Sequence, residues 1–522
     1  MTAGSADPDS AQPAGAGSDL VSVRLEPLSV EVSVPRASSL VSALAAHGVE
    51  FPCGGTGECG ACGVRLLSGS LPITQADRET FSLGQLAAGW RLACQARVSS
   101  ALVLECGQWH MQILSDADVA PSFSAVSSRE KVGEQSALPR GVAIAIDLGT
   151  TTIAAQLVES TTGSVLAVET AMNPQAAFGS DVMSRIRAAL DGSDLTTPIR
   201  TALGQIVTRL AAGHRDQVSD VLVVGNTVMH HLFCGLDVAP LAHVPFASPH
   251  LGEQRFCPRE LSWDLPDSCA IRFARCIGGF VGSDILAGIV ACEISKSHRL
   301  AALVDLGTNG EIAIGNRDGI VCASTAAGPA FEAGAIRMGM RAVTGAIAYV
   351  ALDKNEFRAT VVGDVTPRGI CGSGLVDAVA AGLRTGGILA SGRVADGSKV
   401  FPVAPPVVLH QSDIRELQLA KGAIAAGFHL LLRRLRASTR DLGIIHLAGA
   451  FGNYVQIDSA LRIGLLDAPH FIIRAAGNTA LRGAKMLLLA DREPELPPIE
   501  HVSLAANPAF QDEFANSMTF PE

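Results

Sequence analysis

The sequence contains no apolar run that approaches the ~18 residues of a membrane-spanning helix. It also begins without a basic segment or an apolar signal core, and Asp7 and Asp9 lie near its start. Clustered runs of Lys and Arg are missing as well, and 40 basic against 50 acidic residues leave a net charge of −10. These absences argue against a membrane protein, an exported protein and a nucleic-acid-binding protein. We therefore expect a cytoplasmic protein, and 522 residues, 48% of them hydrophobic, suffice for about three or four domains with large cores.

Cysteine, in contrast, is abundant. Twelve cysteines in a chain expected to be cytoplasmic indicate metal or redox chemistry rather than structural disulfides. Four of them follow the spacing C-x5-C-x2-C-x31-C: Cys53, Cys59, Cys62 and Cys94. Three thiolates on one glycine-rich loop and a fourth from a distant loop suit a [2Fe-2S] cluster, because glycines permit the positive φ angles that aim N–H groups at sulfur. A zinc site with the same ligands is the alternative, and Cys106 is a second candidate for the fourth ligand. The L-A-C-Q context of Cys94 resembles that of ferredoxins, and this resemblance favours Cys94.

The segments around these cysteines predict a small domain. Residues 1–18 are almost all small or polar, which predicts a disordered tail. Apolar and polar residues then alternate from Leu20 and again from Val30, as in two strands, a short helix is expected over 39–47, and a further strand over 64–67. This order resembles a β-grasp ferredoxin over residues 19–107. The polar, aperiodic residues 108–140 predict a linker.

The main repeat of the sequence is Asp147-Leu-Gly-Thr-Thr-Thr152, which returns 158 residues later as Asp305-Leu-Gly-Thr-Asn-Gly-Glu311. Each copy has an apolar run, an Asp, a glycine-containing turn and a second apolar run, which predicts a β-hairpin. Turn N–H groups can wrap a phosphate, and an Asp at the strand end is placed to hold Mg²⁺ or to orient water. The repeat therefore predicts an internal duplication with a phosphate between the halves, and two ordinary hairpins are the alternative. The predicted phosphate-binding residues are Gly149, Thr150, Thr151, Gly307, Thr308 and Asn309.

Further glycine-rich turns lead into helices, an arrangement that can hold phosphate or ribose at a helix N-terminus. The turn from Thr325 to Gly334 suggests that Glu332 joins Asp305 around metal or water. Another candidate for lining the site is the turn from Ile277 to Asp284. The predicted nucleotide-binding residues from the remaining motifs are Gly372, Ser373, Gly374, Lys421 in a helix over 417–435, and Gly449 and Gly452 in a strand-then-glycine segment of the adenosine-motif type.

Two other polar features favour a structural interpretation. Asp181 lies in the first turn of a predicted helix, where capping explains it at least as well as a ligand role. His230 and His231 are adjacent in a helix and therefore point about 100° apart, which is unfavourable for a shared metal.

Paired D-x-G-T turns resemble the phosphate loops of the actin, sugar-kinase and heat-shock-chaperone superfamily of ATPases. Together with the ferredoxin-like segment, the chain resembles the reductive activators of corrinoid proteins over residues 19–107 and 141 to about 510. The resemblance implies a β-grasp [2Fe-2S] ferredoxin domain of α+β type and a duplicated ribonuclease H-like α/β ATPase domain. Its halves would span 141–300 and 301–510, followed by a tail over 511–522.

The same resemblance implies ATP-dependent reduction of a corrinoid from Co(II) to Co(I) in a methyltransferase or demethylase system. Cofactors would be a [2Fe-2S] cluster, ATP and Mg²⁺, with Asp147, Asp305 and Glu332 as catalytic residues. Expected partners are a corrinoid protein and an upstream electron donor, with neither nucleic acid nor membrane, and a homodimer stays open. A plant-type cluster has a potential of about −400 mV, and the resemblance implies that the Co(II)/Co(I) couple lies lower still. Each ~59 mV uphill costs a factor of ten for a one-electron step, so ATP could drive this reduction.

Three alternatives remain at this stage. The chain could donate electrons under ATP control to another low-potential metalloenzyme. It could be a small-molecule kinase with a regulatory ferredoxin domain, which phosphorylation of a metabolite would reveal. It could also be a non-enzymatic scaffold, against which the intact Asp147 and Asp305 argue.

Overall fold

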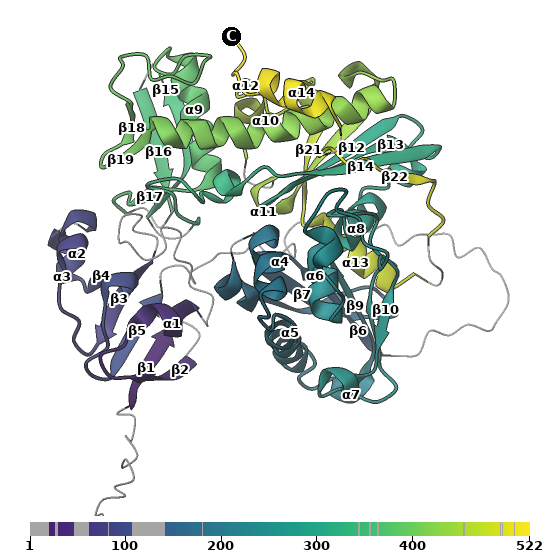
Figure 1. Ribbon diagram of the computed structural model, residues 1–522, viewed down its shortest axis with the longest axis horizontal. Helices are drawn as coiled ribbons and strands as arrows, with labels where there is room; N and C mark the ends of the chain where they lie inside the picture. Colours follow the sequence, from purple (N-terminus) through teal and green to yellow (C-terminus); the bar gives the residue numbers. More distant parts are fainter. Residues whose placement is uncertain are drawn as a thin grey trace, which may run out of the picture.

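The computed structural model describes residues 20–26, 30–45, 62–81, 83–106, 141–179, 181–342, 345–353, 356–362, 365–452, 455–490, 492, 494–505 and 507–522. The predicted N-terminal tail, the predicted linker over 108–140, and Cys53 and Cys59 lie outside these residues. Figure 1 shows three sheet-containing bodies joined in chain order, with a smaller module beside the upper sheet.

The N-terminal domain is a five-stranded mixed sheet in the order β2-β1-β5-β3-β4. Its strands are β1 Leu20–Glu26, β2 Val30–Pro35, β3 Gly63–Ser68, β4 Trp90–Leu92 and β5 Leu102–Cys106, and its helices are α1 Leu40–Ala45, α2 Gln75–Thr80, α3 Leu83–Ala87 and the 3₁₀ turn η1 Ala93–Gln95. Alternation in β1 places Val21, Val23 and Leu25 in the core. The central β1–β5 pair is parallel, whereas β1–β2 and β3–β5 are antiparallel. The predicted β-grasp domain is confirmed.

The first half of the larger region is a six-stranded sheet in the order β10-β11-β9-β6-β7-β8. Its strands are β6 Val142–Leu148, β7 Thr152–Glu159, β8 Val165–Met172, β9 Val218–Gly225, β10 Gln254–Phe256 and β11 Ala270–Phe273, and its helices are α4 Val182–Leu190, α5 Thr196–Leu210, α6 Thr227–Cys234, α7 Pro258–Leu261 and α8 Ser283–Ala291. β6 to β8 form an antiparallel meander, and β9 and β11 add in parallel. Both faces of β6 and β9 are covered, which explains their continuous apolar runs.

The second half repeats this order. Its sheet reads β21-β20-β12-β13-β14-β22, so the meander β12–β14 corresponds to β6–β8, and the parallel strands β20 and β21 correspond to β9 and β11. The bounds are β12 Leu300–Leu306, β13 Gly310–Asn316, β14 Gly319–Thr325, β20 Leu442–Ala448, β21 Ile473–Gly477 and β22 Ile499–His501, with α10 Gln411–Arg434, α11 Gly449–Gly452, α12 Ile457–Arg462, α13 Thr479–Leu488 and α14 Ala509–Ser517. The predicted duplication and both hairpins are confirmed.

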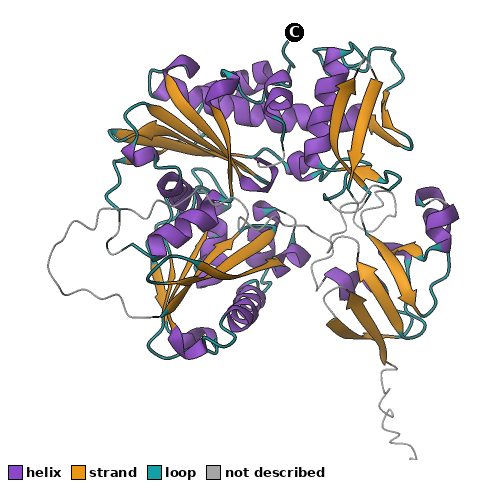
Figure 2. Cartoon of the chain, turned by 180° about the vertical axis from the view of Figure 1, so that it is seen from behind, coloured by secondary structure: helices purple, strands orange, loops and turns teal. Residues whose placement is uncertain are grey.

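Helices α8 and α13 pack on each other between the two sheets, and Figures 1 and 2 show the sheets above and below them. A smaller module is inserted between β14 and α10 and contains β15 Ala346–Asp353, β16 Glu356–Val361, β17 Gly369–Ile370, β18 Val400–Ala404, β19 Val407–His410 and α9 Gly372–Arg384. None of the helices in the described ranges is long and apolar enough to cross a membrane.

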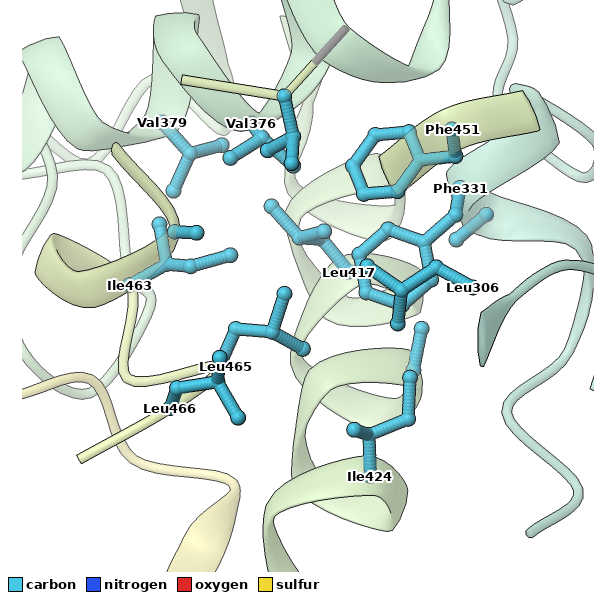
Figure 3. Packing of buried hydrophobic residues seen from close by; sticks show 14 of the residues in the cluster. Leu306, Phe331, Val376, Val379, Leu417, Ile424, Phe451, Ile463, Leu465 and Leu466 are labelled. Carbon is cyan, nitrogen blue, oxygen red and sulfur yellow. The ribbon is translucent and has the colours of Figure 1, made fainter. Parts of the chain in front are cut away.

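One large hydrophobic cluster lies under the second hairpin. Figure 3 shows Phe331 and Phe451 lying near Leu306, Leu417 and Ile424, and the two phenyl rings are 4.7 Å apart between centroids. The same cluster includes Phe520, so the end of the chain is packed rather than loose. The segment expected as a tail over 511–522 thus begins within α14 and closes against α10.

Candidate functional site

Four carboxyl groups gather where the two halves meet. Asp147 is the second-to-last residue of β6, and Asp305 is the second-to-last residue of β12. Glu311 pairs with Asp305 across the second hairpin, and Asp284 lies in the first turn of α8. Burial is the main cause that raises the pKa of Asp147 to about 6, of Asp305 to about 7 and of Asp284 to about 8. Burial, with the nearby Asp284 and Asp305, also raises the pKa of Glu311.

This cluster is chemically suited to a divalent cation. Buried carboxyls that repel one another favour protonation, whereas a cation favours the ionised form and thereby reverses the pKa shifts. Within the described ranges, the side chains of His, Cys, Asp and Glu form no preassembled metal cage of three or more ligands. Mg²⁺ in proteins typically uses one or two carboxylates together with waters and substrate phosphates.

The first phosphate turn is held by two asparagines. Asn226, the N-cap of α6, donates from Nδ2 to Thr150 Oγ1 at 2.9 Å, and its Oδ1 accepts from Met229 N. Asn173 Nδ2 donates to the Gly149 carbonyl at 2.9 Å, and its backbone N–H donates to the Thr151 carbonyl. The turn itself is closed by the Gly149 N–H, which donates to the Thr152 carbonyl at 3.1 Å. Its hydroxyls and N–H groups are therefore fixed before any ligand binds.

The second phosphate turn is tied to the carboxyl cluster. The Gly307 N–H donates to the Asn309 carbonyl at 3.0 Å, and the Asn309 side chain bonds to Glu311. A Cβ built at Gly310 would lie 2.5 Å from Ile424 Cγ1, which shows how closely the start of β13 approaches α10.

The two turns face each other through hydroxyl groups. Thr151 Oγ1 lies 3.5 Å from Thr308 Oγ1, and both bond to the carboxylate of Glu332, at 3.3 and 3.0 Å. Glu332 ends the 3₁₀ turn η7 Pro329–Glu332. One carboxylate thus accepts from one hydroxyl of each half, and these hydroxyls are the groups expected to bind phosphate. The structure brings together Thr151, Thr308 and Glu332, all named from the sequence.

Residues from the end of the chain complete the carboxyl cluster. Asn478, the N-cap of α13, donates from Nδ2 to Asp147 Oδ2 at 2.8 Å. Gly449 has φ +83°, and a Cβ built there would lie 2.5 Å from Asp305 Oδ1. Two residues of the second half, which follow β20 and β21, therefore lie against the aspartates of the two hairpins.

The remaining predicted nucleotide residues have structural partners. Ser373 Oγ donates to the Ala348 carbonyl at 2.8 Å, and Cβ atoms built at Gly372 and Gly374 would clash with the Phe331 and Ile347 carbonyls. Gly452 lies against Leu447. Gly372 thus packs the start of α9 against the residue before Glu332, whereas Ser373 and Gly374 pack it against β15. Their predicted contact with nucleotide stays a prediction.

Lys421 is placed differently. It is 1% exposed, its Nζ donates to the Thr519 carbonyl at 2.7 Å, and burial lowers its pKa to about 8. Its ammonium lies over the Phe520 ring at 5.4 Å. The structure joins Lys421 to the C-terminal segment and does not bring it to the two hairpin turns.

Sequence reasoning did not assign roles to several residues of this site. These are Asp284 and Glu311, which belong to the carboxyl cluster, Asn478, which donates to Asp147, and Asn226, which donates to Thr150. Asp284 and Glu311 stand within motifs already noted, so the signal available was an acidic residue inside a glycine-rich turn. The two asparagines directly follow β9 and β21, each a parallel strand of its sheet.

The cysteine site is described in part. Cys62 is 1% exposed at the start of β3, and Cys94 is half-buried in η1. The Ala93 N–H donates to the Cys62 carbonyl at 3.0 Å, which joins the two cysteine segments, and Gln95 Nε2 donates to Cys94 Sγ at 3.5 Å. An N–H group aimed at sulfur is the environment expected around an iron-sulfur cluster.

Two polar features are structural, as the sequence favoured. Asp181 is the N-cap of α4 and accepts from Ser184 N. His231 Nδ1 donates to the Thr227 carbonyl at 2.8 Å, its Nε2 accepts from Ser248 Oγ, and burial lowers the pKa of both histidines, that of His230 to about 4.

Family models match all three bodies. Residues 23–99 match the 2Fe-2S iron-sulfur cluster binding domain, 142–297 the RACo middle region, and 299–522 the C-terminal domain of RACo, the ASKHA domain. The chain is 34% identical over 423 residues to the corrinoid activation enzyme RamQ of Eubacterium limosum, across 72% of this chain and 70% of that protein. It is 27% identical over 383 residues to the Co(II) methylated amine-specific corrinoid protein reductase of Methanosarcina barkeri, across 66% and 69% of the two chains.

A solved structure is similar along nearly the whole chain. The reductive activator for corrinoid, iron-sulfur protein superposes with a TM-score of 0.64 and 26% identity over 96% of this chain and 98% of that one. Sequence relatives, family models and fold agree with the geometry of the hairpins and cysteines. The chain belongs to the family of reductive activators of corrinoid proteins.

Proposed function

We propose that this chain uses ATP to drive the one-electron reduction of a partner's corrinoid cobalt from Co(II) to Co(I) in the cytoplasm. The partner is a corrinoid protein of a methyltransferase or demethylase system, and an upstream donor supplies the electron through a [2Fe-2S] cluster. One observation carries the proposal, namely that two modules occur in one chain. In the β-grasp domain a backbone hydrogen bond joins the segments of Cys62 and Cys94, and in the duplicated fold Asp147 and Asp305 lie at matching strand ends. Relatives named as a corrinoid activation enzyme and a corrinoid protein reductase support it.

The cluster domain has the role of electron carrier. Cys53, Cys59, Cys62 and Cys94 are proposed as its ligands, and when bound the cluster supplies one electron at a time. The chain contributes the sulfur positions and the donor at Gln95, which tunes the site through its bond to Cys94. The neighbouring core residues exclude water from this side of the sheet, because Val64, Leu92 and Leu104 are fully buried.

The duplicated region has the role of ATPase. Asp147 and Asp305 are proposed to hold Mg²⁺ through oxygens or water, and the turns that carry Thr151 and Thr308 to bind the phosphates. Glu332 accepts from both hydroxyls, and phosphate oxygens would compete with it for the same donors. Once displaced, its carboxylate is available to orient the attacking water. Gly449 is proposed to lie against the adenosine.

The test compares cobalt reduction with and without ATP. Anaerobic mixtures contain the full chain, a corrinoid protein in the Co(II) state and an artificial low-potential donor, and absorbance follows the conversion to Co(I). The intact chain should reduce cobalt rapidly only with Mg²⁺ and ATP. Asp305→Asn, which keeps the size of the side chain and removes its charge, should abolish the ATP-dependent part.

Asp318→Asn is the matched control. Asp318 lies in the turn between β13 and β14 of the same sheet, and its side chain is 79% exposed. This variant should behave as the intact chain does. Equal rate and extent of cobalt reduction with and without ATP would show that the chain is an ordinary electron carrier and would refute the proposal.

A further inference from the structure

Among the described residues, Arg368 of the inserted module contacts Trp90 of the cluster domain. The Arg368 guanidinium carbon lies 4.0 Å from the centroid of the Trp90 ring. Trp90 is the first residue of β4, and Arg368 immediately precedes β17. In Figures 1 and 2 the ferredoxin sheet lies next to β17. A guanidinium stacked on an indole is a favourable cation–π arrangement, and Trp is its best aromatic partner.

The module is shaped to present this arginine. The Arg368 N–H donates to the Gly345 carbonyl at 2.8 Å, which fixes the backbone. Gly345 has φ +94°, and a Cβ built there would lie 2.4 Å from Arg368 Nε. Any larger residue at 345 would displace the guanidinium. Both the backbone bond and the missing side chain therefore direct Arg368 toward the cluster domain.

The ferredoxin side is equally ordered. Trp90 packs on Phe81 at 6.1 Å between ring centroids and pairs with Arg65 of β3. Burial lowers the pKa of Arg368, and Glu105 of β5 acts against this shift, so an acidic group of the cluster domain faces the arginine electrostatically. The contact thus combines stacking with charge complementarity, and such charge complementarity also fixes the orientation of a docked pair.

The position of this contact is informative. β4 leads from Trp90 directly into η1, which carries the proposed ligand Cys94. On the other side, Arg368 leads through β17 to Gly372, where a Cβ would lie 1.7 Å from the Phe331 carbonyl. Phe331 precedes Glu332, which bonds to both phosphate turns. The contact therefore lies on chain segments that lead to both proposed sites.

We propose that residues 365–370 are the receiving surface for this chain's own ferredoxin domain, and that Arg368 is the positioning residue that holds it through Trp90. The role in electron delivery rests on the proposed function, whereas the docking itself does not. Loss of one cation–π contact should lower the ratio of docked to undocked domain roughly 2- to 30-fold.

The experiment uses hydrogen exchange on the full chain, without ATP or corrinoid protein. Arg368→Glu should make peptides over 90–95 and 365–370 exchange faster together, because both surfaces become exposed. Arg368→Lys should restore part of the protection, since it keeps the charge and loses the planar stacking. Arg368→Ala and Trp90→Ala should be non-additive in a double-mutant cycle.

Arg358→Glu is the matched control, because Arg358 lies on β16 of the same module, is 74% exposed and pairs with Asp353 at 3.0 Å. It should leave both peptides unchanged. In the cobalt assay, Arg368→Glu should slow reduction by a similar factor while ATP hydrolysis and the visible spectrum persist. Unchanged exchange in Arg368→Glu would overturn the docking, and faster exchange with unaltered cobalt reduction would overturn its role in electron delivery. Failure of the corrinoid assay in the intact chain would instead affect only the proposed function.

Discussion

Gly449→Ala tests whether the position of the Asp305 carboxylate depends on the absence of a side chain at residue 449. Gly449 has φ +83°, where an L-residue is strained by about 1–2 kcal/mol. A Cβ at this position would lie 2.5 Å from Asp305 Oδ1 and 2.6 Å from the Leu306 carbonyl. The Leu306 carbonyl belongs to a buried central strand, so the carboxylate of Asp305 is the group that must move.

The variant should therefore show two separable effects. The backbone strain should lower the free energy of unfolding by about 1–2 kcal/mol. Displacement of the carboxylate by about 1 Å should lower kcat for ATP hydrolysis roughly 10²-fold, since misplacing a catalytic group by that distance commonly costs such a factor. Thermal or denaturant unfolding measures the first effect, and steady-state phosphate release with saturating Mg²⁺ and ATP measures the second.

Gly386→Ala separates strain from collision. Gly386 follows α9 with φ +71°, and no described atom lies within 4 Å of a Cβ built there. This variant should lose a comparable amount of stability and keep its full kcat. The reasoning is refuted if Gly449→Ala retains the kcat of Gly386→Ala, because Asp305 would then be insensitive to the collision.

Three further outcomes follow from the same contacts. The pKa values of Asp147, Asp305 and Asp284 are raised from 3.8 to about 6, 7 and 8, so their contribution to the stability of the ligand-free chain is present below pH 3.8 and is lost as pH rises to about 8. The gain in Tm from Mg²⁺ and ATP should therefore increase between pH 6 and 8, and a pH-independent gain would contradict this. Cys94→Ser should abolish the visible spectrum of the anaerobically purified chain, whereas Cys106→Ser, at the end of β5, should keep it; the reverse would make Cys106 the ligand. Mg²⁺ with ATP should alter hydrogen exchange over 329–332 and 365–370, and protection confined to the phosphate turns would show that nucleotide is not sensed at Arg368.

The parts of the fold that the sequence predicted are those encoded by short contiguous motifs. The two hairpins depend on Asp-Leu-Gly-Thr, whose Asp, Gly and Thr fit a strand end and a tight turn, and whose repetition reveals the duplication. The cysteine spacing, with the alternating strands around it, likewise indicated the β-grasp domain, because three of the four cysteines stand close together in the sequence. Local chemistry sufficed in both cases.

The parts that escaped prediction depend on contacts between distant segments. Asn478 reaches Asp147 across 331 positions of sequence, and no local pattern marks an N-cap asparagine as a partner of a carboxylate. Lys421 was predicted to bind nucleotide, and no local pattern showed that its ammonium would donate to the Thr519 carbonyl, 98 positions later in the sequence. The sequence shows the charge of a residue but not which segment will cover it.

An ATPase can influence an electron carrier only through an element that both sites contact and that has more than one arrangement. The carboxylate of Glu332 meets this requirement at the phosphate end, because it accepts from Thr151 and Thr308, the groups for which phosphate would compete. Phe331, which precedes Glu332, packs against Phe451 and against the backbone of Gly372. We therefore expect displacement of Glu332 to shift the start of α9. Arg368 shortly precedes this helix start in the chain and contacts Trp90. Trp90 begins β4, the strand that leads to Cys94. This continuity confines the proposed coupling to a few substitutable contacts, among them the Arg368–Trp90 pair.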